Sequence, residues 1–261
     1  MTILVATGLH KEAGILARPG VVVVAGGGDG TRLERELEAA ARDATAILSC
    51  GLAGALAPNL KAGDLVLGSL SQREREGAHR EAVGRANGEV DPDNHPHPSA
   101  ASRLPPSPAG RGTSALVDMV EIQLPGARVG MIVGSDTIVA SATQKKAMYE
   151  ATGALAVDME SHIAARVAAR HSLPFAIIRV ISDSANEALP PAALVGMKPD
   201  GSMALGVVLA SLARNPSQLP ALIRTGLHAG HAFTELRRVG DVLGRLGVGL
   251  ADDLELPLDM R

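Results

Sequence analysis

Two polar clusters stand at the ends of short apolar segments in the second half of the chain. Asp158-Met159-Glu160 follows Ala156-Val157 and leads into an Ala-rich segment, and the apolar run 175–181 contains Arg179 and ends in Ser182-Asp183. In an open α/β sheet, ligands bind beyond the carboxyl ends of the strands. We therefore expect both clusters on the same rim of one sheet.

The rest of the chain repeats this alternation of short apolar runs and helical segments. The predicted strands are residues 3–6, 21–25, 46–50, 64–70, 128–133, 155–157 and 175–181. The predicted helices are residues 31–42, 144–152, 160–171 and 202–214. Strands that alternate with helices predict an α/β fold with a mostly parallel sheet.

Composition narrows the class of protein. The length of 261 residues suits one large domain, 1–261, and the aromatic content of 1% requires a core of aliphatic side chains. A net charge of −3 and the lack of aromatic stacking platforms argue against nucleic acid as a partner. The single Cys50 suits a reducing compartment, and with neither a signal peptide nor a membrane span in the sequence we expect a cytoplasmic protein.

Two regions differ from the strand–helix pattern. Residues 71–115 are rich in Pro and charge, which predicts a mobile surface excursion, and its histidines, His79, His95 and His97, lack the partners of a metal site. Residues 218–250 predict a helical extension with basic flanks. This extension either packs on the domain or a second subunit, or touches a membrane surface.

Several small-residue turns are candidates for ligand contact. Gly26–Gly30 fits neither the dinucleotide nor the P-loop pattern, so it is a turn that lets backbone approach a strand or a ligand, with a ribose or anion pocket as the sharper alternative. In residues 50–56, Ala53 and Gly54 let backbone amides approach a ligand closely. Glu12 is of interest as a general base if it faces Arg179. After strand 128–133, either Asp136 caps the rim or Ile138 floors a base pocket.

These motifs together resemble a known family. Ala53-Gly54, Gly134–Val139, Val157–Glu160 and Arg179–Asp183 stand in the order and spacing of the purine nucleoside phosphorylase/uridine phosphorylase superfamily. Within it the chain looks most like the methylthioadenosine/S-adenosylhomocysteine nucleosidases and the hopanoid-associated phosphorylases. The resemblance covers roughly residues 2–70 and 126–245, and it implies a three-layer α/β/α fold with a central mixed, mostly parallel, twisted sheet.

The resemblance also implies a role for each matching residue. Glu160 would hold the ribose 2′- and 3′-hydroxyls, with Met159 against the sugar and Asp158 beside them. Asp183 would protonate N7 of the departing purine with help from Ser182. Arg179 and Glu12 would address the nucleophile, while Ala53, Gly54 and Ile138 would line the base pocket.

The chain departs from the family at two positions. Leu52 replaces a Ser of the nucleosidases and Ile138 replaces an aromatic residue, which predicts an aliphatic pocket. The Gly-Asp-Pro-x-x-Arg phosphate loop of the hexameric phosphorylases is absent, and Glu12 favours hydrolysis over phosphorolysis. Water and phosphate both remain open as the nucleophile, and no metal or organic cofactor is expected.

The function that the resemblance implies is cleavage of the N-glycosidic bond of an adenine nucleoside with a bulky 5′ group. The hopanoid branch implies adenosylhopane as the lipid-linked substrate, ribosylhopane or its phosphorylated form as the product, and contact with the inner face of the membrane. A methylthioadenosine/S-adenosylhomocysteine nucleosidase is the alternative enzyme, and a non-catalytic nucleoside-binding protein is the alternative class. The resemblance further implies a homodimer.

Overall fold

The computed structural model describes residues 2–70, 108–195 and 204–252. The strands are β1 Ile3–Thr7, β2 Val21–Ala25, β3 Ala46–Ala55, β4 Leu65–Leu70, β5 Arg128–Gly134, β6 Ala156–Asp158 and β7 Phe175–Asp183. The helices are α1 His10–Leu16, α2 Gly30–Ala40, α4 Pro108–Gln123, α5 Ala142–Thr152, α6 Ser161–Arg170, α7 Pro191–Val195, α8 Leu205–Arg214 and α9 Leu219–Asp252, with two short 3₁₀ turns, η1 Ala41–Asp43 and η2 Pro216–Gln218.

The seven described strands form one mixed sheet in the order β2-β1-β3-β6-β5-β4-β7. Parallel pairing joins β1 to β2 and β3, β3 to β7, and β5 to β4 and β6. Antiparallel pairing joins β3 to β6 and β4 to β7. The predicted mixed, mostly parallel sheet is confirmed.

Strand β3 closes this sheet on itself because it pairs with β1, β6 and β7. It extends to Ala55, beyond the predicted end at Cys50. The added residues are small, and a register shift between Ala53 and Gly54 lets the strand leave β7 and meet β6. Gly51 on one side of this shift pairs with Arg179, and Gly54 on the other side pairs with Asp183, so the bend positions these two candidate site residues.

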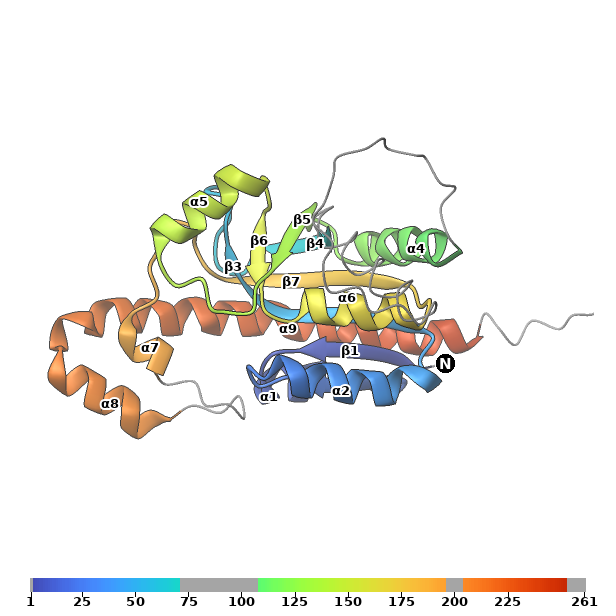
Figure 1. Ribbon diagram of the computed structural model, residues 1–261, viewed down its shortest axis with the longest axis horizontal. Helices are drawn as coiled ribbons and strands as arrows, with labels where there is room; N and C mark the ends of the chain where they lie inside the picture. The colour runs from blue at the N-terminus through green and yellow to red at the C-terminus, as the bar shows by residue number, and fades with distance from the viewer. Residues whose placement is uncertain (1, 71–107, 196–203, 253–261) are drawn as a thin grey trace, which may run out of the picture.

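Helices cover both faces of the sheet, as the three-layer fold requires. On β1, Ile3 and Val5 pack into a core with α9, α4 and α1, whereas Leu4 and Ala6 pack with α2 and α6. Burial of alternate residues on opposite faces explains why the strand is a continuous apolar run. Figure 1 shows α9 running along the length of the molecule.

One expectation about sheet geometry is corrected. The clusters at Asp158 and Asp183 do not lie on a rim of parallel strands, because β6 runs antiparallel to β3 and β3 runs parallel to β7. They come near each other because β6 pairs with β3 at Gly54 and Ala55, beside the residues of β3 that pair with the end of β7. Glu12 lies on the helix α1, whose seven residues are too few for periodicity to reveal.

The irregular excursion predicted for residues 71–115 is wrong at its end, because α4 begins at Pro108. Residues 71–107, with the three histidines, lie outside the described residues. The predicted C-terminal helical extension is a single helix, α9. No helix in the described ranges combines the length and the apolar character needed to cross a bilayer.

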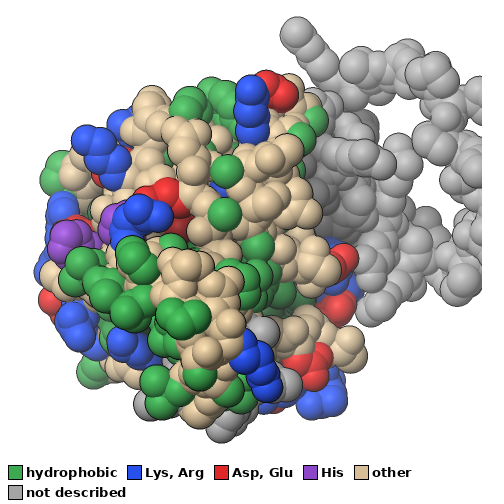
Figure 2. Space-filling view, turned by 90° about the vertical axis from the view of Figure 1, so that its left-hand side faces the viewer, with side chains coloured by type: hydrophobic (Ala, Val, Ile, Leu, Met, Phe, Trp, Pro, Cys, Tyr) green, Lys and Arg blue, Asp and Glu red, His purple; other side chains and the backbone are tan. Residues whose placement is uncertain are grey.

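One end of the molecule exposes apolar side chains on α8 and the first turns of α9. These are Val207, Leu209, Leu219, Ile223 and Leu227, which are 46% to 65% exposed. Residues 204–234 contain no Asp or Glu, whereas Arg214 and Arg224 are exposed there. Figure 2 views this end and shows hydrophobic side chains gathered on it with basic ones between them. We call these five residues the α8–α9 apolar face.

Candidate active site

A buried guanidinium organises one half of the candidate site. Arg179 on β7 is 0% exposed, and its Nε lies 2.7 Å from Asp158 Oδ2. Its Nη2 donates to Ser49 Oγ at 2.6 Å and lies 3.6 Å from Glu160 Oε2. Burial opposes the charge on Arg179, but the carboxylates of Asp158 and Glu160 outweigh it, and the pKa of the guanidinium is raised. This Arg therefore stays charged in the protein interior.

Asp158 ties this guanidinium to the start of α6. Its Oδ1 accepts from the backbone N–H of Glu160 at 3.0 Å and of Ser161 at 2.8 Å, while its Oδ2 binds Arg179. The side chain is fully enclosed. Asp158 thus fixes where Glu160 and Arg179 lie.

Glu12 is held against the same cluster by α1. Its Oε2 accepts from Thr7 Oγ1 at 2.6 Å and from two backbone N–H groups of the β1–α1 turn, and its Oε1 accepts from Leu52 N at 2.8 Å. A Cβ atom at Gly51 would lie 3.0 Å from Thr7 Oγ1 and 3.1 Å from both Arg179 Nη1 and Glu12 Oε1. Glu12 and Arg179 therefore converge on the backbone of Gly51, where a side chain has no room.

Glu160 stands at the edge of this cluster, with 13% of its side chain exposed. Its pKa is raised to about 8, chiefly by burial, with the nearby Asp158 and Glu12 carboxylates adding to the shift and Arg179 opposing it. A strongly shifted group beside a cavity is a marker of a functional site.

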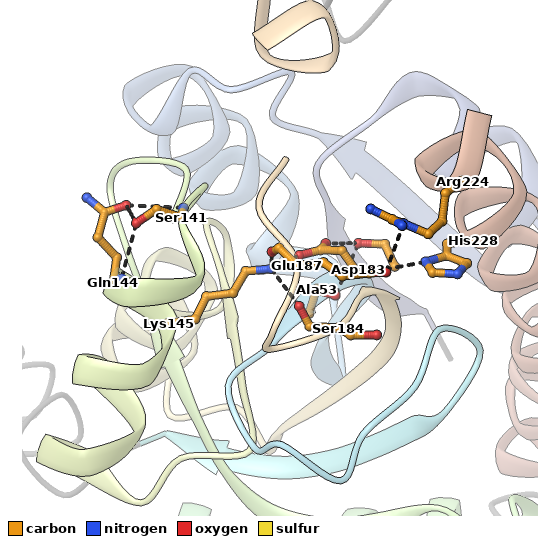
Figure 3. Close-up of polar contacts among 10 residues, drawn as sticks. Ala53, Ser141, Gln144, Lys145, Asp183, Ser184, Glu187, Arg224 and His228 are labelled. Atoms are coloured by element: carbon orange, nitrogen blue, oxygen red, sulfur yellow. Dashed lines mark hydrogen bonds and ion pairs between the residues drawn. The ribbon is translucent and has the colours of Figure 1, made fainter. Parts of the chain in front are cut away.

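The second half of the site surrounds Asp183 at the end of β7. Its Oδ1 accepts from Ser182 Oγ at 2.7 Å, and Ser182 Oγ lies 3.2 Å from the carbonyl oxygen of Ala53. Asp183 Oδ2 lies 3.2 Å from the position of a Cβ at Gly54. Asp183 also forms an ion pair with Lys145, a fully buried lysine on α5. Figure 3 shows Lys145 reaching from α5 toward this end of the site.

A cavity of about 260 Å³ opens beside Glu160. It is lined by Gly26, Gly28, Asp29, Gly30, Thr31, Leu33, Glu34, Asp136, Met159, Glu160, Ile163 and Arg166. The glycine turn that sequence reasoning left open thus lines a pocket together with Met159 and Glu160. Asp183, Arg179 and Glu12 are not part of its lining.

The predicted site residues therefore form two groups joined by β3. Gly51 pairs with Arg179 and Gly54 pairs with Asp183, so the groups lie three residues apart along one strand. At about 3.3 Å per residue this is a separation of about 10 Å. Ile138 lies outside the cavity lining and is 39% exposed, and Asp136 bonds to His162 at 3.0 Å.

Sequence reasoning missed three polar residues of the site. Lys145 faces Asp183, Ser49 binds Arg179, and Thr7 binds Glu12. Ser49 and Thr7 looked like ordinary strand residues. Lys145 is followed by Lys146, and only the capping of α5 by Ser141 and Gln144 hints which lysine turns inward.

Two observations in the described ranges concern possible metal ligands and the thiol of Cys50. They contain no group of three or more His, Cys, Asp and Glu side chains that could hold a metal ion. The pKa of the Cys50 thiol is raised to about 12, first by burial and further by Glu12, with Arg179 opposing. A thiol that stays protonated is a poor nucleophile.

The closed mixed sheet, with helices on both faces and a buried charged cluster at its bend, defines an α/β protein. The chain belongs to the phosphorylase superfamily, whose sequence profile matches residues 10–201. A 5′-methylthioadenosine/S-adenosylhomocysteine nucleosidase of Staphylococcus aureus strain MRSA252 is 29% identical over 146 residues, which are 54% of this chain and 57% of the relative. The chain thus spans little more than half the length of the curated relatives it matches.

Solved structures agree on the fold. A Streptococcus pneumoniae nucleosidase for the same two nucleosides, in complex with 8-aminoadenine, has a TM-score of 0.52 at 22% identity and covers 81% of this chain and 99% of its own. A Helicobacter pylori futalosine hydrolase mutant has a TM-score of 0.53 at 18% identity and covers 92% and 99%.

Proposed function

We propose that the protein cleaves the N-glycosidic bond of an adenine nucleoside. The observation that carries this proposal is the buried cluster in which Glu12, Asp158 and Glu160 surround Arg179 beside a cavity lined by Met159 and Glu160. The superfamily membership and the nucleosidase relatives support the same reaction.

In this proposal a nucleoside lies along β3, and the residues of the two groups have separate roles. Glu160 binds the ribose hydroxyls, Met159 lies against the sugar, and Asp183 protonates the purine as the bond to the sugar breaks. Fixing the diol and protonating the base both lower the barrier, and one acid–base group typically contributes about 10²–10⁴-fold.

The nucleophile in this proposal approaches between Glu12 and Arg179. Arg179 Nη1 is a buried donor without a hydrogen-bond partner among the described residues, and it faces Glu12 Oε1 across Gly51. A carboxylate beside this donor favours water over an anion, so we propose hydrolysis, with phosphate as the competing cosubstrate. No metal or organic cofactor takes part in the proposed reaction.

We propose adenosylhopane as the substrate, with adenine and ribosylhopane, or its phosphorylated form, as products of hopanoid biosynthesis. The α8–α9 apolar face and the absence of carboxylates in residues 204–234 support contact of a cytoplasmic protein with an anionic membrane surface. The curated relatives instead favour methylthioadenosine or S-adenosylhomocysteine as the substrate. The homodimer is likewise a proposal, and analytical ultracentrifugation measures it.

Adenine release tests the reaction and its substrate. Methylthioadenosine, S-adenosylhomocysteine and adenosylhopane are each incubated with the protein, with and without phosphate. We expect adenine from adenosylhopane without phosphate, and loss of this activity in Asp183→Asn while adenine still binds. Preference for methylthioadenosine would support the alternative enzyme. Tight nucleoside binding without adenine release would support a non-catalytic binding protein. The contacts of Ser182 and Lys145 with the two oxygens of Asp183 favour this alternative.

Vesicle flotation tests the membrane contact separately. Wild type should float with vesicles containing anionic phospholipid, and the triple variant Leu219→Ser/Ile223→Ser/Leu227→Ser should not. Ile122→Ser removes an exposed apolar side chain on α4, outside this face, and serves as the control. If wild type does not bind these vesicles, or if Arg237→Ala/Arg238→Ala and the triple variant both turn over membrane-embedded substrate normally, the membrane contact is wrong.

A further inference from the structure

Lys145 is one of the largest fully buried side chains in the part of the chain that the structure describes. An isolated ammonium in the protein interior is costly, so such a lysine requires a partner. Its Nζ bonds to Asp183 Oδ2 and donates to the carbonyl oxygens of Ser184 and Glu187, each at 2.9 Å. These three acceptors match the three hydrogens of the ammonium.

Helix α5 aims this side chain. Ser141 and Gln144 form a capping box at the start of the helix, where Ser141 Oγ accepts from Gln144 N at 3.1 Å. Lys145 is the next residue, and its side chain points inward, whereas Lys146 points outward with 76% of its side chain exposed. Figure 3 shows the cap and the lysine on the same helix, with the lysine directed at Asp183.

The segment after Asp183 is held from the opposite side. The Glu187 carboxylate lies 3.0 Å from Arg224 Nε and 3.2 Å from His228 Nδ1, both on α9. Its backbone carbonyl meanwhile accepts from Lys145. The turn at residues 184–187 is therefore fixed between α5 and α9, and the carboxylate of Glu187 faces away from Lys145.

We propose that Lys145 is a positioning residue for Asp183 in glycosidic cleavage, an inference that rests on the proposed function. Lys145 on Oδ2 and Ser182 on Oδ1 fix the plane of the carboxyl group above Gly54. In the reaction, the proton moves from Asp183 to the purine, and the electrons of the broken C–N bond stay with the base. Lys145 keeps its own protons and stabilises the carboxylate that is left behind.

A lysine that only stabilises the fold would give different results when it is replaced. Loss of such an anchor would lower stability and would affect all functions of the site together. Loss of a positioning cation affects the acid selectively. A carboxyl group that has lost its orientation transfers the proton less often, so kcat falls, whereas nucleoside binding at Glu160 and KM change little.

The test compares steady-state adenine release by wild type, Lys145→Met, Lys145→Arg and the matched surface control Lys146→Met. For Lys145→Met we expect kcat to fall about 10- to 100-fold, less than the contribution of a full acid, with KM changed less than about threefold. Lys145→Arg should recover part of kcat, and Lys146→Met should match wild type.

Two further variants separate positioning from folding. Glu187→Gln loosens the same turn from the α9 side without removing the ammonium from Asp183, so it should lower kcat less than Lys145→Met does. In the Asp183→Asn background, which also relieves the stranded charge, Lys145→Met should cause no further loss of kcat.

A Lys145→Met enzyme with the kcat of wild type would overturn the inference and leave the proposed function intact. So would a loss of kcat that is undiminished in the Asp183→Asn background. A wild-type protein that releases adenine from no nucleoside would remove both the proposed function and this inference.

Discussion

At one end of the site, the three carboxylates of Glu12, Asp158 and Glu160 lie around the single guanidinium of Arg179, whereas at the other end Asp183 faces the single ammonium of Lys145. The first end carries excess negative charge, and the pKa of Glu160 is raised to about 8 as burial and its neighbours disfavour ionisation. The second end is balanced one to one. The stability of the protein should therefore respond differently to loss of the cation at each end, and it should depend on pH through Glu160.

The largest difference is expected when the cation of each end is removed. Arg179→Met leaves several enclosed carboxylates without their cation. Breaking a buried ion pair in this way lowers the free energy of unfolding by about 3–5 kcal/mol. Lys145→Met strands one carboxylate whose side chain is 11% exposed, so its cost should be smaller. Urea unfolding measures both variants against Arg42→Met, an exposed control that should stay within about 0.5 kcal/mol of wild type. Equal losses for Arg179→Met and Lys145→Met would remove the distinction between the ends.

The next effect is the pH dependence of stability at the Glu160 end. Because the pKa of Glu160 is raised to about 8 in the folded state, the native protein binds more protons than the unfolded chain between about pH 4.3 and pH 8. Stability from this group is therefore complete below about pH 4.3 and falls as pH rises, by up to about 1.4 kcal/mol per pH unit. Urea unfolding at pH 5, 6 and 7 should show this slope in wild type and a flatter one in Glu160→Gln. Parallel slopes would contradict it.

Glycine replacements probe the space at each end. A Cβ at Gly51 would press on three polar atoms at 3.0 to 3.1 Å, so Gly51→Ala should lower stability by about 1–3 kcal/mol. A Cβ at Gly54 meets chiefly Asp183 Oδ2 at 3.2 Å, which can shift slightly. Gly54→Ala should therefore lower kcat with a smaller loss of stability. Thermal unfolding measures the loss of stability, and adenine release measures kcat. A larger loss of stability in Gly54→Ala than in Gly51→Ala would contradict these distances.

The smallest expected effect concerns one hydroxyl at the Asp183 end. Ser182→Ala removes one hydroxyl hydrogen bond to Asp183 Oδ1, and for a loss of about 1 kcal/mol kcat should fall about fivefold. Ser217→Ala removes an exposed hydroxyl that bonds only to Asn215 and should have no effect. A loss in Ser182→Ala as large as that in Lys145→Met would mean that the hydroxyl, and not the ammonium, holds the acid.

Much of the fold could be predicted because buried strands leave a direct trace in the sequence. The apolar runs that begin near Ile3, Val21, Arg128 and Phe175 each form a strand, and β1 and β7 are the buried ones while β2 and β5 are partly exposed. The direction of β6 could not be predicted, because three residues carry no signal of their orientation. It depends on the bend of β3 at Gly54, which is a long-range pairing.

The site was predictable where residue types carry chemistry and unpredictable where they carry only geometry. Glu160 and Asp183 stand out because carboxylates follow apolar strands. Lys145 does not stand out, since a lysine on a surface helix is usually solvated, and it is buried here only because α5 lies where Lys145 reaches Asp183 at the end of β7. The same holds for Ser49, whose hydroxyl meets Arg179 only after β3 and β7 pair.

The triple pairing of β3 has a consequence for how the protein acquires its site. Residues 46–55 bond to two segments far apart in the chain, Ile3–Thr7 before them and Phe175–Asp183 much later. Pairing across such long stretches of chain is slow to form. A fragment that lacks Phe175–Asp183 removes Arg179 from Gly51 and Asp183 from Gly54, and a fragment that lacks Ile3–Thr7 removes Thr7 from Gly51. The ability to bind the nucleoside should therefore appear in a single late step of refolding. No partly folded form should bind one end of the ligand alone.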